Sequence, residues 1–209
     1  MTQRTDLPES AMTRTIDYYF ATISPYAYLG HDRFVAIAQR HGATVAVKPI
    51  NLGEVFPASG GLPLSKRAPQ RQAYRLVELQ RWSEFLRKPM HVQPRFFPVN
   101  GDLAACWILA AAESGPARAL ALAGAVGRAI WEQERNIAEA ATMEAIAVEC
   151  GLPAALAARA QAPEIAEKYA ALTREAIARG VFGAPTYVVE DELFWGQDRL
   201  DFLDRKMAK

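Results

Sequence analysis

Residues 14–50 read RTIDYYFATISPYAYLGHDRFVAIAQRHGATVAVKPI, with two β-prone runs on either side of a helical one. The runs at 14–20 and 43–50 are rich in aromatic and β-branched residues, which is typical of strands. Between them, Ser24 followed by Pro25 predicts a helix start, because serine caps a helix and proline fits its first turn. The segment therefore predicts a β-α-β unit with parallel strands and a right-handed crossover.

A helical block separates this unit from a second region of β structure. Residues 53–69 are rich in glycine and proline and are expected to form a loop. Helices are then predicted at 70–87, 102–113, 117–135, 140–150, 153–161 and 163–179. A hairpin at 186–190 and 192–195 precedes a last helix that begins near Gln197 or Asp198. The order predicts an α/β, thioredoxin-like fold with a large all-helical insertion between its βαβ and ββα halves.

The predicted domain boundaries follow from this order. Residues 14–65 and 181–209 would form the thioredoxin-like domain, and residues 66–180 the inserted helical domain. Residues 1–13 are polar and lack the apolar core of a secretory signal, so we expect a disordered N-terminal tail there.

The composition narrows the classes of function. The 209-residue chain is 51% hydrophobic with a formal net charge of +1, so it can bury a sizeable core and lacks the basic balance of a nucleic-acid binder. No apolar run is long enough to span a bilayer, and the three histidines share no metal-ligand spacing. Cys106 and Cys150 form no CxxC pair, which together with the missing signal predicts a cytoplasmic protein.

The start of the first helix is a candidate site. Free backbone N–H groups and the helix dipole favour an anion there, particularly a thiolate. Redox enzymes of this fold place cysteines at the positions held here by Ser24 and Ala27, so the protein itself cannot exchange disulfides at this site. The Ser24 hydroxyl could instead donate a hydrogen bond to a thiolate brought by a ligand. Ordinary helix capping would also explain a serine here.

A second feature is Pro185, which follows Gly183 and Ala184 and directly precedes a predicted strand. It is a candidate cis-proline, which would place the backbone of Ala184 opposite Ser24. The unpaired N–H and C=O groups there could bind an extended peptide as an added strand. A simple strand boundary would also explain this proline.

Four motifs give the chain a resemblance to a known family: SPYAYLG at 24–30, FPVN at 97–100, GVFGAPT at 180–186 and LFWGQDRL at 193–200. Nearly the whole chain after Arg14 resembles the 2-hydroxychromene-2-carboxylate isomerases, which are close relatives of kappa-class glutathione transferases. The resemblance implies a glutathione-dependent cis–trans isomerase that acts on a small aromatic carboxylate from aromatic-ring degradation. It also implies a homodimer.

The resemblance assigns roles around glutathione. Ser24 would hold the glutathione sulfur as a thiolate, and Ala184, ahead of Pro185, would pair with the cysteinyl backbone. Gln197 and Asp198 would receive the γ-glutamyl end, where Asp198 suits the α-ammonium group. Both residues could also simply cap the last helix.

The resemblance also assigns residues to the glycyl carboxylate of glutathione, to the carboxylate of the substrate and to the substrate pocket. Lys66 or Arg67 would contact the glycyl carboxylate of glutathione, and could also hold the substrate carboxylate. Tyr26, Asn100 and Trp195 would border the substrate pocket.

The chain departs from the family pattern at Gly61, where relatives commonly carry an asparagine that helps to bind glutathione. Asn51, Lys66 or Arg67 would have to compensate, or glutathione binds more weakly. Two alternatives to the isomerase remain open at this point. One is a kappa-type glutathione transferase or peroxidase, and the other is a non-catalytic thioredoxin-fold module that binds peptides.

Overall fold

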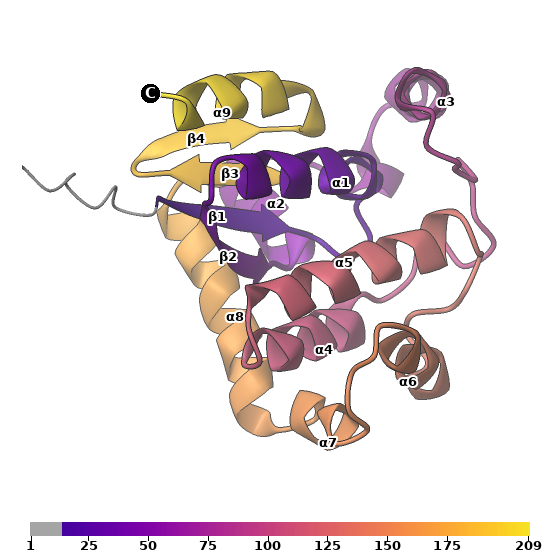
Figure 1. The fold of residues 1–209 in the computed structure, drawn as a ribbon. Coiled ribbons are helices and arrows are strands. Elements are labelled where there is room, and N and C mark those ends of the chain that lie inside the picture. Colours follow the sequence, from indigo (N-terminus) through magenta and orange to yellow (C-terminus); the bar gives the residue numbers. More distant parts are fainter. Residues whose placement is uncertain (1–13) are drawn as a thin grey trace, which may run out of the picture.

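A computed structural model describes residues 14–209, in which four strands form one mixed sheet (Figure 1). The strands are β1 (Thr15–Phe20), β2 (Thr44–Pro49), β3 (Thr186–Val189) and β4 (Glu192–Trp195), in the spatial order β2-β1-β3-β4. β1 is parallel to β2 and antiparallel to β3, which pairs in turn with β4. The predicted βαβ and ββα halves therefore share one sheet, as a thioredoxin fold requires. The tail expected at 1–13 lies outside the described residues.

The helices of residues 14–209 agree with most of the predicted ones. They are α1 (Pro25–Arg40), α2 (Leu52–Ser59), α3 (Pro69–Leu86), α4 (Asp102–Ala112), α5 (Pro116–Trp131), α6 (Ala140–Glu149), α7 (Leu156–Ala160), α8 (Pro163–Ala178) and α9 (Leu200–Met207). Two short 3-10 helices, η1 (Leu64–Lys66) and η2 (Gln197–Arg199), complete the set. In the described part of the chain, no helix has the length and apolar character to cross a membrane.

Four of the predicted elements differ from the structure. The expected loop at 53–69 contains α2, because the Asn51 side chain caps it by accepting a hydrogen bond from the Gly53 N–H at 2.8 Å. The helix predicted from 117 ends at Trp131, and the one predicted at 153–161 is only the short α7. The last helix begins at Leu200, after the η2 turn. Caps and turns set these ends, and the periodic pattern alone does not reveal them.

The two faces of the sheet pack against different helices. Alternate residues of β1, including Ile16 and Tyr18, are buried on the side of α1 and α9. Tyr19 points to the other side and packs with Val55 of α2 and Ala176 of α8. Figure 1 shows α1 in front of the sheet and α2 behind it. Because β1 is buried on both faces, its side chains fix α1 and the loop that precedes it.

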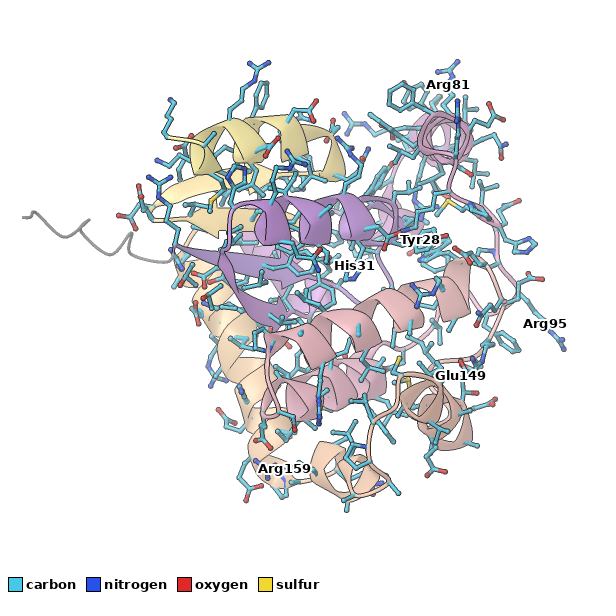
Figure 2. All side chains as sticks on the ribbon, viewed as in Figure 1. Tyr28, His31, Arg81, Arg95, Glu149 and Arg159 are labelled. Carbon is cyan, nitrogen blue, oxygen red and sulfur yellow. The ribbon has the colours of Figure 1, made fainter. Side chains whose placement is uncertain are left out.

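Glycines let α5 approach α1 closely. A Cβ on Gly124 would lie 2.8 Å from His31 Nε2, and one on Gly127 would lie 3.1 Å from the Tyr28 ring. Figure 2 shows His31 lying between α1 and α5. The helix that SPYAYLG begins, α1, is therefore held between the sheet and α5.

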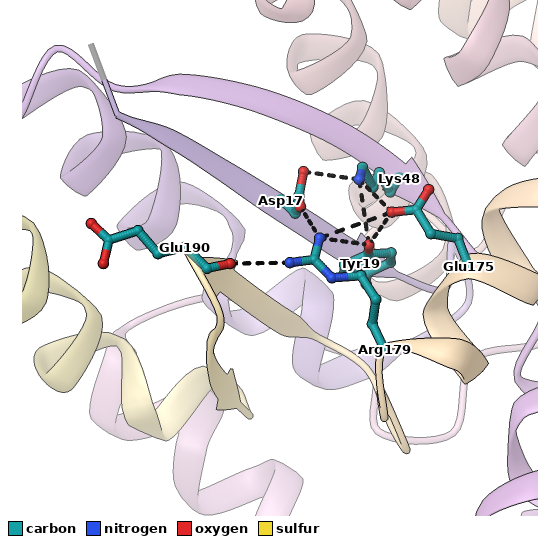
Figure 3. Close-up of polar contacts among 6 residues, drawn as sticks. All are labelled: Asp17, Tyr19, Lys48, Glu175, Arg179 and Glu190. Atoms are coloured by element: carbon teal, nitrogen blue, oxygen red, sulfur yellow. Dashed lines mark hydrogen bonds and ion pairs between the residues drawn. The ribbon is translucent and has the colours of Figure 1, made fainter. Parts of the chain in front are cut away.

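Polar side chains fasten α8 to the sheet, as Figure 3 shows. Lys48 of β2 forms ion pairs with Asp17 of β1 at 2.9 Å and with Glu175 of α8 at 2.7 Å. The Tyr19 hydroxyl also donates to Glu175, and Arg179 pairs with Asp17. Burial raises the pKa of Glu175, but its bonds with Lys48 and Tyr19 outweigh this effect and lower the pKa overall. The cluster is a structural link between elements distant in sequence.

Candidate active site

Ser24 is the N-cap of α1, with an extended backbone and a side chain that is only 5% exposed. Its Oγ accepts a hydrogen bond from the Ala27 N–H at 3.2 Å. The same hydroxyl donates to the carbonyl oxygen of Ala184 at 3.3 Å. The structure thus brings Ser24 and Ala184 together at the N-terminus of α1, where the helix dipole favours an anion.

The peptide bond between Ala184 and Pro185 is cis. The loop around it is held on both sides, since the Thr186 hydroxyl donates to the Gly183 carbonyl at 2.8 Å and the Gly196 N–H donates to the Pro185 carbonyl at 2.8 Å. A second cis peptide bond, which was not predicted, joins Phe97 and Pro98.

The η2 turn forms a second wall of the site. Gln197 is 1% exposed, and its Oε1 accepts from Arg33 Nη1 at 3.3 Å. Asp198 is exposed and forms an ion pair with Arg199. The buried side chain of Gln197 therefore holds the turn in place, whereas the exposed carboxylate of Asp198 is accessible to a ligand.

A cavity of about 300 Å³ joins these elements. Its lining comprises Tyr26, Arg67, Glu78, Trp82, Ala184, Trp195 and the 196–199 turn. A second cavity of about 370 Å³ continues from it along α3, because Tyr26, Arg67 and Glu78 line both. A larger cavity of about 870 Å³ runs along α1 and α5 but contains none of the predicted site residues. The chemistry of the lining locates the site, and the size of the cavity does not.

Four predicted residues do not line these cavities: Ser24 and Pro185 lie behind Ala184, which does, while Lys66 and Asn100 stand apart. Lys66 is exposed on η1 and lines neither cavity, while its neighbour Arg67 lines both. Asn100 also lines neither, because its side chain accepts from the Asp102 N–H at 2.8 Å at the start of α4. The chain near it supports the site indirectly, since Gly101 accepts from the Thr22 hydroxyl at 3.1 Å in the loop before Ser24.

The loop that lacks the family asparagine has no spare room. A Cβ on Gly61 would lie 2.7 Å from the Phe56 ring, so a side chain there would displace that ring. Asn51 is occupied as the cap of α2. Of the three residues expected to compensate, only Arg67 faces the cavity.

The contribution of α3 to the site was not predicted from the sequence. Arg71, Arg75, Glu78 and Trp82 line the two cavities, and their spacing of four, three and four residues places them on one helix face. Only that spacing could have revealed them, because the arginines resemble a solvated face and Trp82 resembles a core residue. Figure 1 shows α3 beyond the N-terminal end of α1.

Two aromatic residues from the prediction do lie at the site. Tyr26 donates a hydrogen bond from its hydroxyl to Glu78 at 2.6 Å, and burial together with this bond raises the pKa of Tyr26. Trp195 is 44% exposed and packs on Phe182, with ring centroids 4.8 Å apart. The site therefore offers a neutral phenol and an exposed indole face to a flat ligand.

The charges of the cavity favour an anionic ligand. Arginines outnumber carboxylates in the lining, and the carboxylate of Glu78 already accepts a hydrogen bond from Tyr26. Guanidinium groups bind carboxylates through two parallel hydrogen bonds. Among residues 14–209, no group of three His, Cys, Asp or Glu side chains is arranged to hold a metal ion.

The sequence model of the DsbA-like thioredoxin domain matches residues 15–208, so the chain belongs to that class of proteins. It is 31% identical to a 2-hydroxychromene-2-carboxylate isomerase of Sphingobium xenophagum, over 92% of this chain and 97% of the relative. A solved structure of 2-hydroxychromene-2-carboxylate isomerase superposes with a TM-score of 0.77 at 30% identity, covering 93% of this chain and 94% of that one. Within the DsbA-like class, the chain belongs to the 2-hydroxychromene-2-carboxylate isomerase family.

A more distant similarity covers part of the chain. Glutathione S-transferase kappa 1 of Caenorhabditis elegans is 34% identical over 82 residues, which is 39% of this chain and 36% of the relative. The isomerase relatives match over nearly the whole chain, and the transferase does not.

Proposed function

We propose that this protein is a glutathione-dependent cis–trans isomerase that acts on a 2-hydroxychromene-2-carboxylate-like substrate. The observation that carries the proposal is the Ser24 hydroxyl, which faces Ala184 at the start of α1 with no cysteine in the cavity lining. Cys106 and Cys150 lie on α4 and at the end of α6. A thiolate at Ser24 would therefore come from a ligand.

The groups around the cavity fit glutathione. Ser24 and the α1 N-terminus suit a thiolate, and the carbonyl of Ala184 suits a cysteinyl N–H. Asp198 suits the α-ammonium group of the γ-glutamyl end, and Arg67 suits the glycyl carboxylate at the opposite end. When bound, glutathione supplies a nucleophilic sulfur whose addition and departure allow rotation about a conjugated double bond.

The residues of the protein stabilise the thiolate of glutathione and orient the aromatic substrate. The Ser24 hydroxyl, redirected from Ala184, donates to the sulfur and lowers its pKa together with the amides of α1. Tyr26 stays protonated because burial and Glu78 raise its pKa, so its ring serves as a neutral wall. The exposed indole of Trp195 offers a second surface for an aromatic substrate.

Calorimetry with reduced glutathione, followed by turnover of 2-hydroxychromene-2-carboxylate, tests the proposal. We expect binding at millimolar concentration or tighter, reduced in Asp198→Ala, and isomerisation only when glutathione is present. Arg205→Ala, on the exposed side of α9, is the matched control. Absence of glutathione binding would contradict the proposal and favour a peptide-binding module.

The kappa-type transferase is the second candidate, favoured by the partial similarity to glutathione S-transferase kappa 1. The two activities would use the same thiolate and differ in the electrophile. A generic aromatic electrophile assayed beside the chromene carboxylate separates them. Faster reaction with the generic electrophile would identify the transferase.

A further inference from the structure

Arg75 is a buried charge without a partner. Its side chain lies on α3 in the wall of the second cavity and is 9% exposed. No hydrogen bond or ion pair joins its guanidinium to another of the residues 14–209. Within these residues the guanidinium makes a cation–π contact with the Phe97 ring, whose centroid lies 5.3 Å from Arg75 Cζ. A guanidinium carries five N–H donors, and those of Arg75 are free to bind an acceptor that enters the cavity.

The charges near Arg75 are mostly positive. Arg67, Arg71 and Arg75 are spaced four residues apart and all line the second cavity. The one carboxylate of its lining, Glu78, accepts a hydrogen bond from Tyr26 and forms no ion pair with Arg75. Burial lowers the pKa of Arg75, and Arg67 acts in the same direction while Tyr26 and Glu78 oppose. Arg71 and Arg75 lie one turn apart on α3 and Arg67 lies just before it, so their like charges repel one another and an anion in the cavity would stabilise all three.

The shape of the site identifies the kind of anion. The second cavity continues into the proposed glutathione cavity through Tyr26, Arg67 and Glu78. Tyr26 and Tyr74 add aromatic surface beside the arginines, and Tyr74 is 58% exposed. A flat ring with one carboxylate would satisfy the guanidinium and cover these aromatic faces.

We propose that Arg75 binds the carboxylate of an aromatic substrate and places its ring beside Tyr26, next to the sulfur held at Ser24. This inference rests on the proposed function for the identity of the sulfur. It assigns Arg67 to the glycyl carboxylate of glutathione and Arg75 to the substrate, so that two anions bind side by side without competing. Arg75 is thereby a specificity-determining residue for carboxylate over neutral substrates.

Two unreactive probes test the assignment, 2-naphthoate and its neutral counterpart 2-naphthamide, titrated by calorimetry with and without saturating glutathione. We expect the wild type to prefer the carboxylate, and Arg75→Met to bind it about 10- to 100-fold more weakly with unchanged binding of the amide. The matched control is Arg81→Met, because Figure 2 shows Arg81 on the far side of α3, pointing away from the molecule. Arg75→Lys keeps the charge but loses the planar fork, so its affinity should fall between the two.

Three results would overturn the proposal. The first is that Arg75→Met binds 2-naphthoate as tightly as the wild type does. The second is that the wild type binds 2-naphthoate and 2-naphthamide equally tightly. The third is that glutathione displaces 2-naphthoate. The last would show that Arg75 serves the glycyl carboxylate. If Arg75→Met does not fold, equal affinity of Arg75→Lys and wild type overturns the proposal instead.

Failure of the proposed function gives a different pattern. The glutathione-free titration would still show the carboxylate preference and its loss in Arg75→Met, while glutathione binding and turnover would be absent. With an active enzyme, Arg75→Met should raise KM for the chromene carboxylate more than it lowers kcat, because the carboxylate is bound equally in the ground and transition states.

Discussion

Gly30 of α1 lies directly against Gln197 of the η2 turn: a Cβ on Gly30 would lie 2.7 Å from the Cβ of Gln197. The missing side chain lets the turn pack on the helix six residues, about 1.7 turns, beyond Ser24. Gln197 is buried there and held by Arg33. The position of Asp198 relative to Ser24 thus depends on Gly30, which is not itself one of the predicted site residues.

Gly30→Ala should push the η2 turn away from α1. We expect the free energy of unfolding to fall by about 1–3 kcal/mol, as for other overpacked sites. Glutathione affinity should fall by roughly 10-fold as Asp198 moves, the equivalent of about 1.4 kcal/mol. Calorimetry and denaturant unfolding measure the two effects.

Gly124→Ala is the matched control for this prediction. It adds the same methyl group against His31, between α1 and α5, and Gly124 does not line the two cavities of the candidate active site. It should lower stability and leave glutathione affinity unchanged. Equal glutathione affinity in Gly30→Ala and wild type would show that the turn does not depend on the close approach.

Ser24→Ala should lower kcat by roughly 10- to 1000-fold, on the scale of losing one preorganised donor. The lost helix cap costs about 1 kcal/mol of stability, which leaves the protein folded. The pKa of the bound glutathione sulfur should rise, and a pH titration of thiolate absorbance would detect the rise. Ser24→Thr keeps the hydroxyl and should retain part of the activity. Wild-type turnover in Ser24→Ala would remove this hydroxyl from the mechanism.

Gly183→Ala should displace the indole of Trp195, because a Cβ on Gly183 would lie 2.5 Å from Trp195 Nε1. A rotated indole no longer forms the aromatic wall, so we expect KM for the aromatic substrate to rise several-fold with a smaller change in glutathione affinity. Steady-state kinetics with each reactant varied in turn measures both. Trp195→Phe keeps an aromatic face and should change KM less. A Gly183→Ala enzyme with unaltered KM would exclude Trp195 from substrate binding.

His31 should make stability depend on pH. Burial, opposed by Asp32, lowers the pKa of His31 to about 4, against about 6.5 in an unfolded chain. Below pH 6.5 the unfolded state therefore binds a proton that the folded state does not, and stability is lost as the pH falls towards 4. The loss amounts to about 3 kcal/mol between pH 7 and pH 4.

The matched variant is His31→Gln, which has no titrating group at this position. Denaturant unfolding at a series of pH values should show a shallower loss of stability in this variant than in wild type, even if its stability at pH 7 is lower. Parallel curves for the two proteins between pH 7 and pH 4 would contradict the assigned pKa shift.

The sequence by itself determined the elements that depend on local chemistry. The β-branched and aromatic run at 14–20 formed β1, and Ser24 with Pro25 started α1. Pro185 was predicted to be cis and is cis, and Ser24 and Ala184 meet as expected. These features succeed because a cap, a proline or a strand pattern acts on its own few residues.

Only the tertiary structure decided which side chains share the cavity. The local sequence pattern could not distinguish between Lys66 and Arg67 as the cavity residue. It also predicted that Asn100 borders the substrate pocket, whereas the Asn100 side chain caps α4 and lines neither cavity. Arg75 looks in sequence like Arg71 and Arg81, the exposed arginines of α3, yet it is among the most buried residues of that helix. The face that a polar helix turns inward depends on the path of the chain on either side of it, and that path is set by packing across the whole molecule.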